Sequence, residues 1–296
     1  MSHPLISVIC LCYNQQAFVG AAIRSVLSQT YAHVELIVVD DASTDNSQSA
    51  IREAIGNRDI RFIRLSENIG NCAAFNRGLE ISTGAYVIDL AADDLLLPSR
   101  IETGVRDFSK ASDKAGVHFS DAFIINETGD VLRTHYRRDS HGQLAETVPS
   151  GNLYLDLVRK YFICPPTMMI RRRVLEALGG YDESLHYEDF DFWVRSSREF
   201  DYLFNKAPLV KKRIVRGSHG MSQSRLRNHH QESTLKVCKK IYSLNKSPEE
   251  DEALLWRCNY EIRQSLKTLN VGLVPKFKTL KKLVQRRLSS SSSMDR

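Results

Sequence analysis

The sequence predicts a doubly wound α/β fold followed by a helical extension. Three observations predict it: unbroken apolar runs rich in branched residues, amphipathic segments that alternate with these runs, and a helical periodicity that dominates after residue 229. With 296 residues and 42% hydrophobic content, the chain is long enough to bury one large core. One main domain with a helical appendage is therefore expected.

The first half of the chain alternates strands with helices. Leu5–Cys12 (LISVICLC) has no polar face, as expected of a parallel strand that is buried on both sides. The same reasoning predicts strands at 35–39, 60–65 and 86–90, with amphipathic helices between them at 17–29, 45–55 and 70–81.

After Pro98 the pattern becomes mixed α+β, still joined to the same sheet. We expect helices at 99–108, 152–161, 172–178 and 190–200, strands near 117–126, 131–136 and 202–205, and a polar loop at 137–151. The predicted domains are a main α/β domain at 1–225, with halves 1–98 and 99–225, a basic helical extension at 226–288 and a disordered serine-rich tail at 289–296.

Charge and cysteine content restrict the location and the partners. The net charge of +6 is too mild to indicate nucleic acid, but the basic residues gather after Lys206, which suits an anionic membrane surface or simple solubility. The six cysteines form no C-x-x-C pair, and no apolar run approaches the ~20 residues that span a bilayer. A cytoplasmic protein, at most peripheral at the inner face of the plasma membrane, is expected.

Acidic residues follow two of the predicted strands, where ligands of α/β sheets bind. Asp40 and Asp41 come directly after 35–39, so a carboxylate there can accept a hydrogen bond from a nucleobase, although both acids also suit a helix cap. Asp93 and Asp94 follow 86–90, and hard divalent cations prefer such oxygens. A solvated acidic turn is the alternative for this second pair.

Two further candidates lie beyond residue 180. Glu188, Asp189 and Asp191 stand in HYEDFDFWVR, where an apolar wall can raise the pKa of a carboxylate toward that of a general base. They also suit the N-terminal turn of a helix, whose dipole favours acids. His219, in RGSHGMS, can bind a metal or donate to phosphate, or it can be an ordinary surface histidine.

Taken in order, residues 5–222 resemble the family 2 glycosyltransferases of the GT-A fold, whose Rossmann-like mixed sheet binds nucleotide-diphospho-sugars. The resemblance is carried by the opening block through VVDDASTD, by ENIGNCAAFNRGLEISTGAYVIDLAADDLLLP and by the block from PPTMMI through GGYDESLHYEDFDFWVR. The family's metal motif, usually D-x-D, here has Ala91 in place of its first acid.

The resemblance implies specific roles. Asp189, with Glu188 beside it, corresponds to the catalytic base, and Asp41 corresponds to the residue that contacts a uracil or thymine base. Mn²⁺ or Mg²⁺ is implied at Asp94, Asp93 and His219. The nucleotide-binding residues that it implies are Tyr13, Asn14, Asp41, Asn71, Asn76 and Asp93.

The implied activity is an inverting transfer of a sugar from a nucleotide-sugar donor, UDP being favoured, to a hydroxyl of a saccharide or lipid-linked saccharide, as in surface polysaccharide or lipopolysaccharide assembly. Because of Ala91, the alternative is a catalytically inactive nucleotide-sugar-binding protein. An oxidoreductase is disfavoured because no G-x-G-x-x-G follows the first strand, and a nucleic-acid binder because no binding motif appears. The basic helices are expected to meet membrane lipids, a partner enzyme or a second copy.

Overall fold

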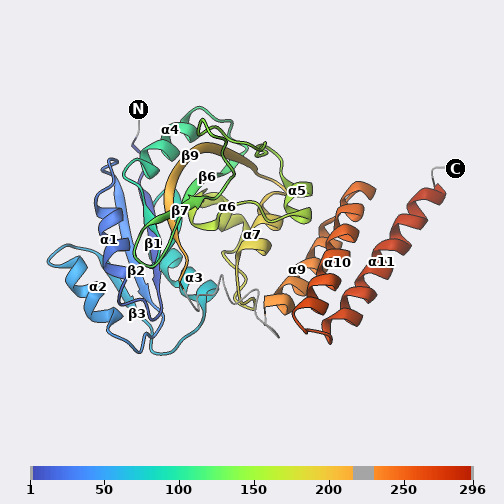
Figure 1. The fold of residues 1–296 in the computed structure, drawn as a ribbon, viewed down its shortest axis with the longest axis horizontal. Helices are drawn as coiled ribbons and strands as arrows, with labels where there is room; N and C mark the ends of the chain where they lie inside the picture. Colours follow the sequence, from blue (N-terminus) through green and yellow to red (C-terminus); the bar gives the residue numbers. More distant parts are fainter. Residues whose placement is uncertain (1–2, 216–229, 295–296) are drawn as a thin grey trace. The chain divides into compact units, whose positions relative to one another are not determined.

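A computed structural model describes residues 3–215 and 230–294 of the chain (Figure 1). Its strands are β1 (Ile6–Cys12), β2 (Val34–Asp40), β3 (Arg61–Arg64), β4 (Tyr86–Ala91), β5 (Leu95–Leu96), β6 (Ala115–Ile125), β7 (Val131–Thr134), β8 (Met169–Arg171) and β9 (Asp201–Arg213). Its helices are α1 (Val19–Leu27), α2 (Ser47–Ile55), α3 (Asn71–Ile81), α4 (Arg100–Ser109), α5 (Tyr154–Arg159), the short 3₁₀ turn η1 (Pro165–Thr167), α6 (Arg172–Leu178), α7 (Asp189–Ser196), α9 (His230–Leu244), α10 (Pro248–Lys267) and α11 (Leu273–Met294).

The chain divides into two compact units. The first contains residues 3–152, 163–184 and 196–215, and the second contains 153–162, 185–195 and the described residues from 230 onward. This division differs from the linear one predicted from sequence, because two short segments before residue 200 belong with the C-terminal helices.

The first unit is built on one mixed sheet with the order β3-β2-β1-β4-β8-β6-β9-β5, and β7 pairs with β6 outside this path. β1 is parallel to β2 and β4, and β2 is parallel to β3, whereas β8 runs antiparallel to both β4 and β6. The predicted α/β order of the first half and the mixed sheet of the second half are both confirmed.

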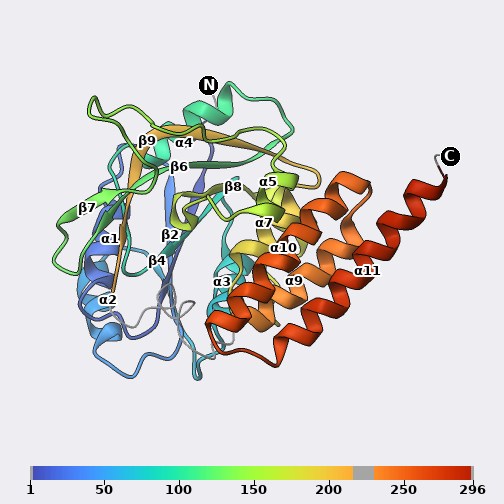
Figure 2. The ribbon, with the colours of Figure 1, turned by 45° about the vertical axis from the view of Figure 1, so that its right-hand side comes forward.

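Helices cover both faces of the parallel part of the sheet, with α1 and α2 on one side and α3 on the other (Figures 1 and 2). On the first side, Val8 and Cys10 join the core formed with Ile23 and Ile51. On the other side, α3 approaches so closely that a Cβ added to Gly78 would lie 2.5 Å from Cγ2 of Ile9. The unbroken apolar run of β1 follows from burial on both faces.

A polar cluster around the buried His118 lies between α4 and the sheet. Nε2 of the buried His118 lies 3.0 Å from an Asp107 carboxylate oxygen, which also accepts a hydrogen bond of 2.6 Å from Asn205. Burial, together with the nearby Arg100 guanidinium, outweighs the attraction of Asp107 and lowers the pKa of His118 to about 4. Hydrogen bonds from His118 and Asn205 outweigh the effect of burial on Asp107 and lower its pKa to about 2.

These shifts predict a loss of stability on acidification. The pKa of His118 in the folded chain, about 4, lies below the ordinary value of 6.5, so the folded state favours the neutral ring and loses stability as the pH falls from 6.5 to 4. Asp107 adds a further loss between its ordinary value of 3.8 and about 2. We expect His118 by itself to lower the free energy of unfolding by up to about 3 kcal/mol between pH 7 and pH 4. Urea titration would measure this contribution as the difference between the native chain and His118→Gln at each pH, and a difference that does not change with pH would contradict the prediction.

The second unit is a bundle in which α11 packs against α10 and α9. Its centre holds the buried Arg257, whose guanidinium lies 4.2 Å from the ring centroid of Tyr161 and donates to the carbonyl of Val158. Arg287 fastens α11 by pairing with Asp251 and by donating to the carbonyl of Tyr242 over 2.7 Å. Among the described residues, no helix has the length and the apolar content needed to cross a membrane.

α11 continues through Met294, whereas the sequence predicts disorder from residue 289. The Ser289 and Ser290 hydroxyls donate to the carbonyls of Gln285 and Arg286, one turn earlier, at 2.6 and 3.0 Å. Such bonds satisfy the hydroxyl within the helix, so the low-complexity composition does not interrupt it.

Candidate functional site

The predicted nucleotide and metal residues of the first unit leave the sheet at one edge. Cys12 of β1 is the register partner of Asp40 of β2, and Leu11 is the partner of Ala91 of β4. The residues that follow these three strands therefore emerge side by side. Because neighbouring strands lie about 4.8 Å apart, the ends of β2 and β4 are about 10 Å apart, a separation suited to a nucleoside at one end and a diphosphate at the other.

Tyr13 and Asn14 form the loop that follows β1. Asn14 has a φ of +53°, a conformation that asparagine tolerates better than most residues. Its backbone N–H donates to Oγ of Ser43 over 2.9 Å, and its side-chain oxygen accepts from the backbone N–H of Thr44 over 2.8 Å. Asn14 thus ties the loops after β1 and β2 together, while the Tyr13 side chain beside it is 42% exposed.

Asp41, which follows β2, is buried, and its carboxylate lies at the N-terminus of α3. Its two carboxylate oxygens accept the backbone N–H groups of Ile69, at 2.8 Å, and of Gly70, at 3.0 Å. It therefore orders the helix N-terminus, where the exposed Asn71 is the first helical residue. An ionised carboxylate has about four acceptor positions, so these two bonds leave capacity for a donor on a ligand.

Asn76, on the next turns of α3, holds the Gly-Gly-Tyr-Asp turn that follows α6. Its amide nitrogen donates to the Tyr181 carbonyl and to the Glu183 carboxylate, both at 2.9 Å, and its amide oxygen accepts from the Tyr181 N–H at 3.0 Å. Gly180 has a φ of +78°, and a Cβ there would lie 2.5 Å from the Asn76 oxygen. Because the turn occupies both amide N–H groups of Asn76, this side chain has an architectural role that sequence reasoning did not predict.

The Asp93–Asp94 turn closes on itself, since the Asp94 N–H donates to the Ala91 carbonyl over 3.0 Å. Asp94 is only 4% exposed, and one of its oxygens accepts from the backbone N–H of Arg213 over 2.7 Å. Burial, followed by the charge of Asp93, raises the pKa of Asp94 to about 8. Two adjacent carboxylates, one of them desolvated, form an environment that a divalent cation would stabilise.

Within residues 3–215 and 230–294, no cluster of three or more histidine, cysteine or acidic side chains has the arrangement of a complete metal site. Mg²⁺ and similar ions are commonly held by one or two carboxylates together with water and substrate phosphates. The Asp93–Asp94 pair fits that mode of binding. His219, the third predicted ligand, lies outside the described residues.

Arg213, the last residue of β9, holds the Asp93–Asp94 turn from outside. Beyond its backbone bond to Asp94, its Nε donates to the Asp93 carbonyl over 3.0 Å, and its Nη1 donates to the carbonyls of Asn126 and Glu127, both over 2.9 Å. The guanidinium also lies 4.7 Å from the ring centroid of Phe18. The sequence pattern gave no signal for this residue, because the predicted strand ended near Asn205.

We expect Arg213→Lys to weaken Mn²⁺ binding by about 10 to 100-fold, the range typical of residues that orient metal ligands. Lysine keeps the charge but cannot reproduce the fork of donors. Titration of Mn²⁺ by electron paramagnetic resonance would measure the change, with Lys211→Gln on the same strand as control. Unchanged Mn²⁺ affinity in a folded Arg213→Lys protein would contradict this role.

The acidic string around Asp189 belongs to the second unit. Asp189 is the first residue of α7, and the carbonyl of Glu188 accepts the Phe192 N–H over 2.9 Å. Asp191 is buried between Arg195, at 2.6 Å, and Lys240, at 2.5 Å. Of the three acids, Asp191 therefore serves the structure of the bundle. The three aromatic side chains expected to form an apolar wall are buried: Phe190, Phe192 and Trp193.

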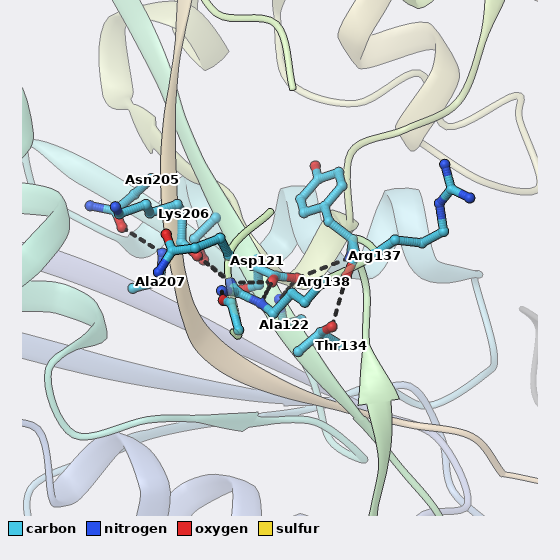
Figure 3. Close-up of polar contacts among 12 residues, drawn as sticks. Asp121, Ala122, Thr134, Arg137, Arg138, Asn205, Lys206 and Ala207 are labelled. Carbon is cyan, nitrogen blue, oxygen red and sulfur yellow. Dashed lines mark hydrogen bonds and ion pairs between the residues drawn. The ribbon is translucent and has the colours of Figure 1, made fainter. Parts of the chain in front are cut away.

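The polar segment 137–151, expected to be a loop, is held at its start by hydrogen bonds to Asp121 (Figure 3). The buried Asp121 of β6 accepts the N–H groups of Ala122 and Tyr136 on one oxygen and the Arg138 guanidinium, at 2.7 Å, on the other. Arg138 also donates to the carbonyl of Lys206 over 2.6 Å. The start of this loop is thus fixed to β6 and β9.

Comparison with known proteins identifies the family. Residues 7–179 match the family model described as Glycosyl transferase family 2. An uncharacterized glycosyltransferase of Methanocaldococcus jannaschii is 29% identical over 248 residues, which make up 80% of each chain. One of Rickettsia bellii is 29% identical over 253 residues, which make up 84% of this chain and 34% of the relative, so the chain spans about a third of that relative's length.

Solved structures resemble the fold at low sequence identity. The mannosyltransferase PcManGT of Pyrobaculum calidifontis, in complex with GDP-Man and Mn²⁺, aligns with a TM-score of 0.62 at 16% identity, covering 99% of this chain and 81% of its own. Residues 1–349 of S. aureus TarS, in complex with UDP-GlcNAc, also align with a TM-score of 0.62, at 15% identity, covering 99% of this chain and 92% of that one. The chain therefore belongs to glycosyltransferase family 2 and has the GT-A fold.

Proposed function

We propose that the protein transfers a sugar from a nucleotide-sugar donor to a hydroxyl group of a saccharide or lipid-linked saccharide, with inversion at the anomeric carbon. The observation that carries the proposal is the placement of Asp41 and of the Asp93–Asp94 turn at one sheet edge, on strands about 10 Å apart. Membership of the family supports the reaction class. The whole reaction, its substrates and its partners stand as proposals.

In the donor site, Asp41 would accept a hydrogen bond from the imide of a pyrimidine base, and Tyr13, Asn14 and Asn71 border the same strand ends. Asp93 would hold the ribose, and Asn76 would act on this site through the turn that it holds. Asp93 and Asp94, with His219, would hold Mn²⁺ or Mg²⁺. A bound cation there would neutralise the diphosphate and stabilise it as a leaving group. PcManGT, solved in complex with Mn²⁺, supports such metal use.

Asp189 is proposed as the general base, assisted by Glu188. Its carboxylate would accept the proton of the acceptor hydroxyl as that oxygen forms a bond to the anomeric carbon. The bond from the same carbon to the diphosphate oxygen breaks in the same step, and the electron pair leaves with the nucleoside diphosphate. Attack from the face opposite the leaving group inverts the anomeric configuration.

The donor nucleotide can be identified by thermal unfolding with UDP-, dTDP- and GDP-sugars, each with and without Mn²⁺ or Mg²⁺, since a ligand that binds only the native state raises Tm. We expect a metal-dependent rise with a UDP-sugar. Asp41→Asn should reduce the rise with pyrimidine nucleotides, because an amide presents donors as well as an acceptor to the base. No rise with any nucleotide would refute a donor site at Asp41, Asp93 and Asp94.

A second candidate function is binding of a nucleotide sugar without catalysis, which the substitution at Ala91 favours. Ala91 ends β4 and is exposed, so the turn offers one carboxylate fewer than the family pattern. One assay distinguishes the two candidate functions. Release of UDP from a donor that binds identifies a transferase or hydrolase, whereas binding without release identifies the inactive form.

For the acceptor and the location, we propose a lipid-linked saccharide used in surface polysaccharide or lipopolysaccharide assembly, met at the inner face of the plasma membrane. The basic character of the C-terminal helices supports this part of the proposal. Transfer of radiolabelled sugar to a membrane fraction, compared with free oligosaccharides, would test it. Equal transfer to free oligosaccharides would count against a lipid-linked acceptor.

A further inference from the structure

The positive charge of the chain is concentrated in one segment of the second unit. Residues 262–294 contain eight lysine and arginine residues and no aspartate or glutamate. Since the whole chain carries +6, the remaining residues sum to a net charge of −2. The excess of positive charge therefore comes entirely from the end of α10 and from α11.

The exposed face of α11 carries a row of cations. Its packed face is formed by Leu273, Phe277, Leu280 and Val284, which are all buried. Lys278, Lys282 and Arg286 follow one another at intervals of four residues, are exposed, and each lies about 6 Å from the next along the helix axis. Among residues 3–215 and 230–290, the side chains of these three form no hydrogen bond or ion pair.

The neighbouring α10 exposes two aromatic side chains one turn apart. Trp256 is 49% exposed and Tyr260 is 39% exposed, and their rings stack with a centroid distance of 5.7 Å and an interplanar angle of 7°. Arg263 and Lys267 continue the same helical face. Rings with an apolar body and a polar atom prefer the interface between lipid and water.

α10, which carries the aromatic pair, and α11, which carries the cations, pack against each other. Nζ of Lys281 donates to the side-chain oxygen of Asn259 over 2.8 Å. Asn259 precedes Tyr260 in α10, and Lys281 lies one turn from Lys278 and next to Lys282. Figure 2 shows α10 and α11 side by side. We call the combined surface the aromatic–basic face; it comprises Trp256, Tyr260, Arg263, Lys267, Lys278, Lys282 and Arg286.

We propose that the aromatic–basic face binds the surface of a bilayer containing anionic lipids. The unpaired cations complement the headgroup charge, and the aromatic pair can enter the headgroup region. A second copy of the same face would meet like charges, which disfavours self-association through it. The inference rests on the proposed function in one respect, since it brings the enzyme to a lipid-linked acceptor.

The test is sedimentation of the full chain with vesicles of phosphatidylcholine alone and of phosphatidylcholine with about one third phosphatidylglycerol. We expect binding only to the anionic vesicles and weaker binding as salt rises. The triple variant Lys278→Glu, Lys282→Glu and Arg286→Glu should lower the partition coefficient by at least about 100-fold, at about fivefold for each cation lost. Trp256→Ser with Tyr260→Ser should lower it by about 10-fold or more.

The matched control makes the same charge change on exposed residues of the first unit: Arg24→Glu, Arg52→Glu and Lys110→Glu. It should keep at least half of the vesicle binding. Equal losses in both triple variants would show a response to net charge alone and overturn the proposal. Three other results would also overturn the proposal. They are no binding to anionic vesicles, tighter binding to a single-stranded oligonucleotide than to vesicles, and a dimer that the face variants dissociate.

Donor binding distinguishes this inference from the proposed function. The face variants should keep the thermal shift with nucleotide sugar, because none of their residues belongs to the donor site. If the native chain binds donor but not vesicles, the face proposal fails and the proposed activity stands. If the native chain binds vesicles but no donor, the proposed activity fails and the face proposal stands.

Discussion

Asp189→Asn is expected to lower kcat by about 10² to 10⁴-fold while leaving the affinity for nucleotide sugar unchanged. Asparagine keeps the size of the side chain and its place at the start of α7 but cannot accept the proton of the acceptor hydroxyl. A loss confined to kcat is the result expected of a general base. Initial rates of UDP release with acceptor present, and donor affinity by calorimetry, would measure the two quantities.

The control is Asp191→Asn, two residues along the same helix. That change removes the charge partner of Arg195 and Lys240, so it should lower Tm without removing the proton acceptor. Glu188→Gln should cost less activity than Asp189→Asn. If Glu188→Gln proves the more severe, the roles of the two neighbouring acids must be exchanged.

Asp94→Asn should abolish the metal-dependent rise in Tm and lower kcat/KM by on the order of 10² to 10³-fold, the effect of losing several kcal/mol of charge stabilisation at the leaving group. The asparagine oxygen can still accept the backbone N–H of Arg213, so the turn should survive. In the metal-free protein the same change removes repulsion from Asp93 and should keep or raise Tm. Calorimetry with and without Mn²⁺ would measure both effects on Tm: the lost rise with metal, and the unchanged or higher Tm without it.

Two outcomes would contradict this assignment. Retention of the metal-dependent rise by Asp94→Asn would place the cation elsewhere. A fall of Tm in the metal-free variant would show that the carboxylate supports the fold rather than a ligand. Asp45→Asn serves as the matched control, because the Asp45 carboxylate accepts the backbone N–H groups of Gln16 and Ser47 near the other strand end.

The elements that could be predicted most closely from the sequence are those that are mostly apolar and mostly buried. β1, β2 and β4 are of this kind, and the sequence places each within one residue of its observed ends. β5 and β8 escaped prediction because two or three residues are too short to show a period. β9 was expected only near 202–205, yet it extends to Arg213 through Pro208 and a basic run, because register shifts along β6 accommodate that irregular stretch.

Some residues of the candidate site could likewise be predicted from the sequence, and others could not. Asp41, Asp93 and Asp94 follow predictable strands, so their common edge could be expected from the topology alone. Arg213 and Asn76 act through backbone carbonyls and amides that are distant in sequence, and residue type carries no signal for such contacts. The choice of Asp189 over Asp191 rested on resemblance, and the ion pairs that occupy Asp191 became visible only in three dimensions.

The interlock between Asn76 and Gly180 has an evolutionary consequence. A side chain at position 180 must displace the amide of Asn76, and a change at position 76 releases the turn that ends at Glu183. Position 180 is therefore restricted to glycine twice, by the Asn76 amide and by a φ of +78°, which strains other residues even where Asn76 is replaced. A single contact thus constrains two residues that are more than a hundred positions apart in the chain.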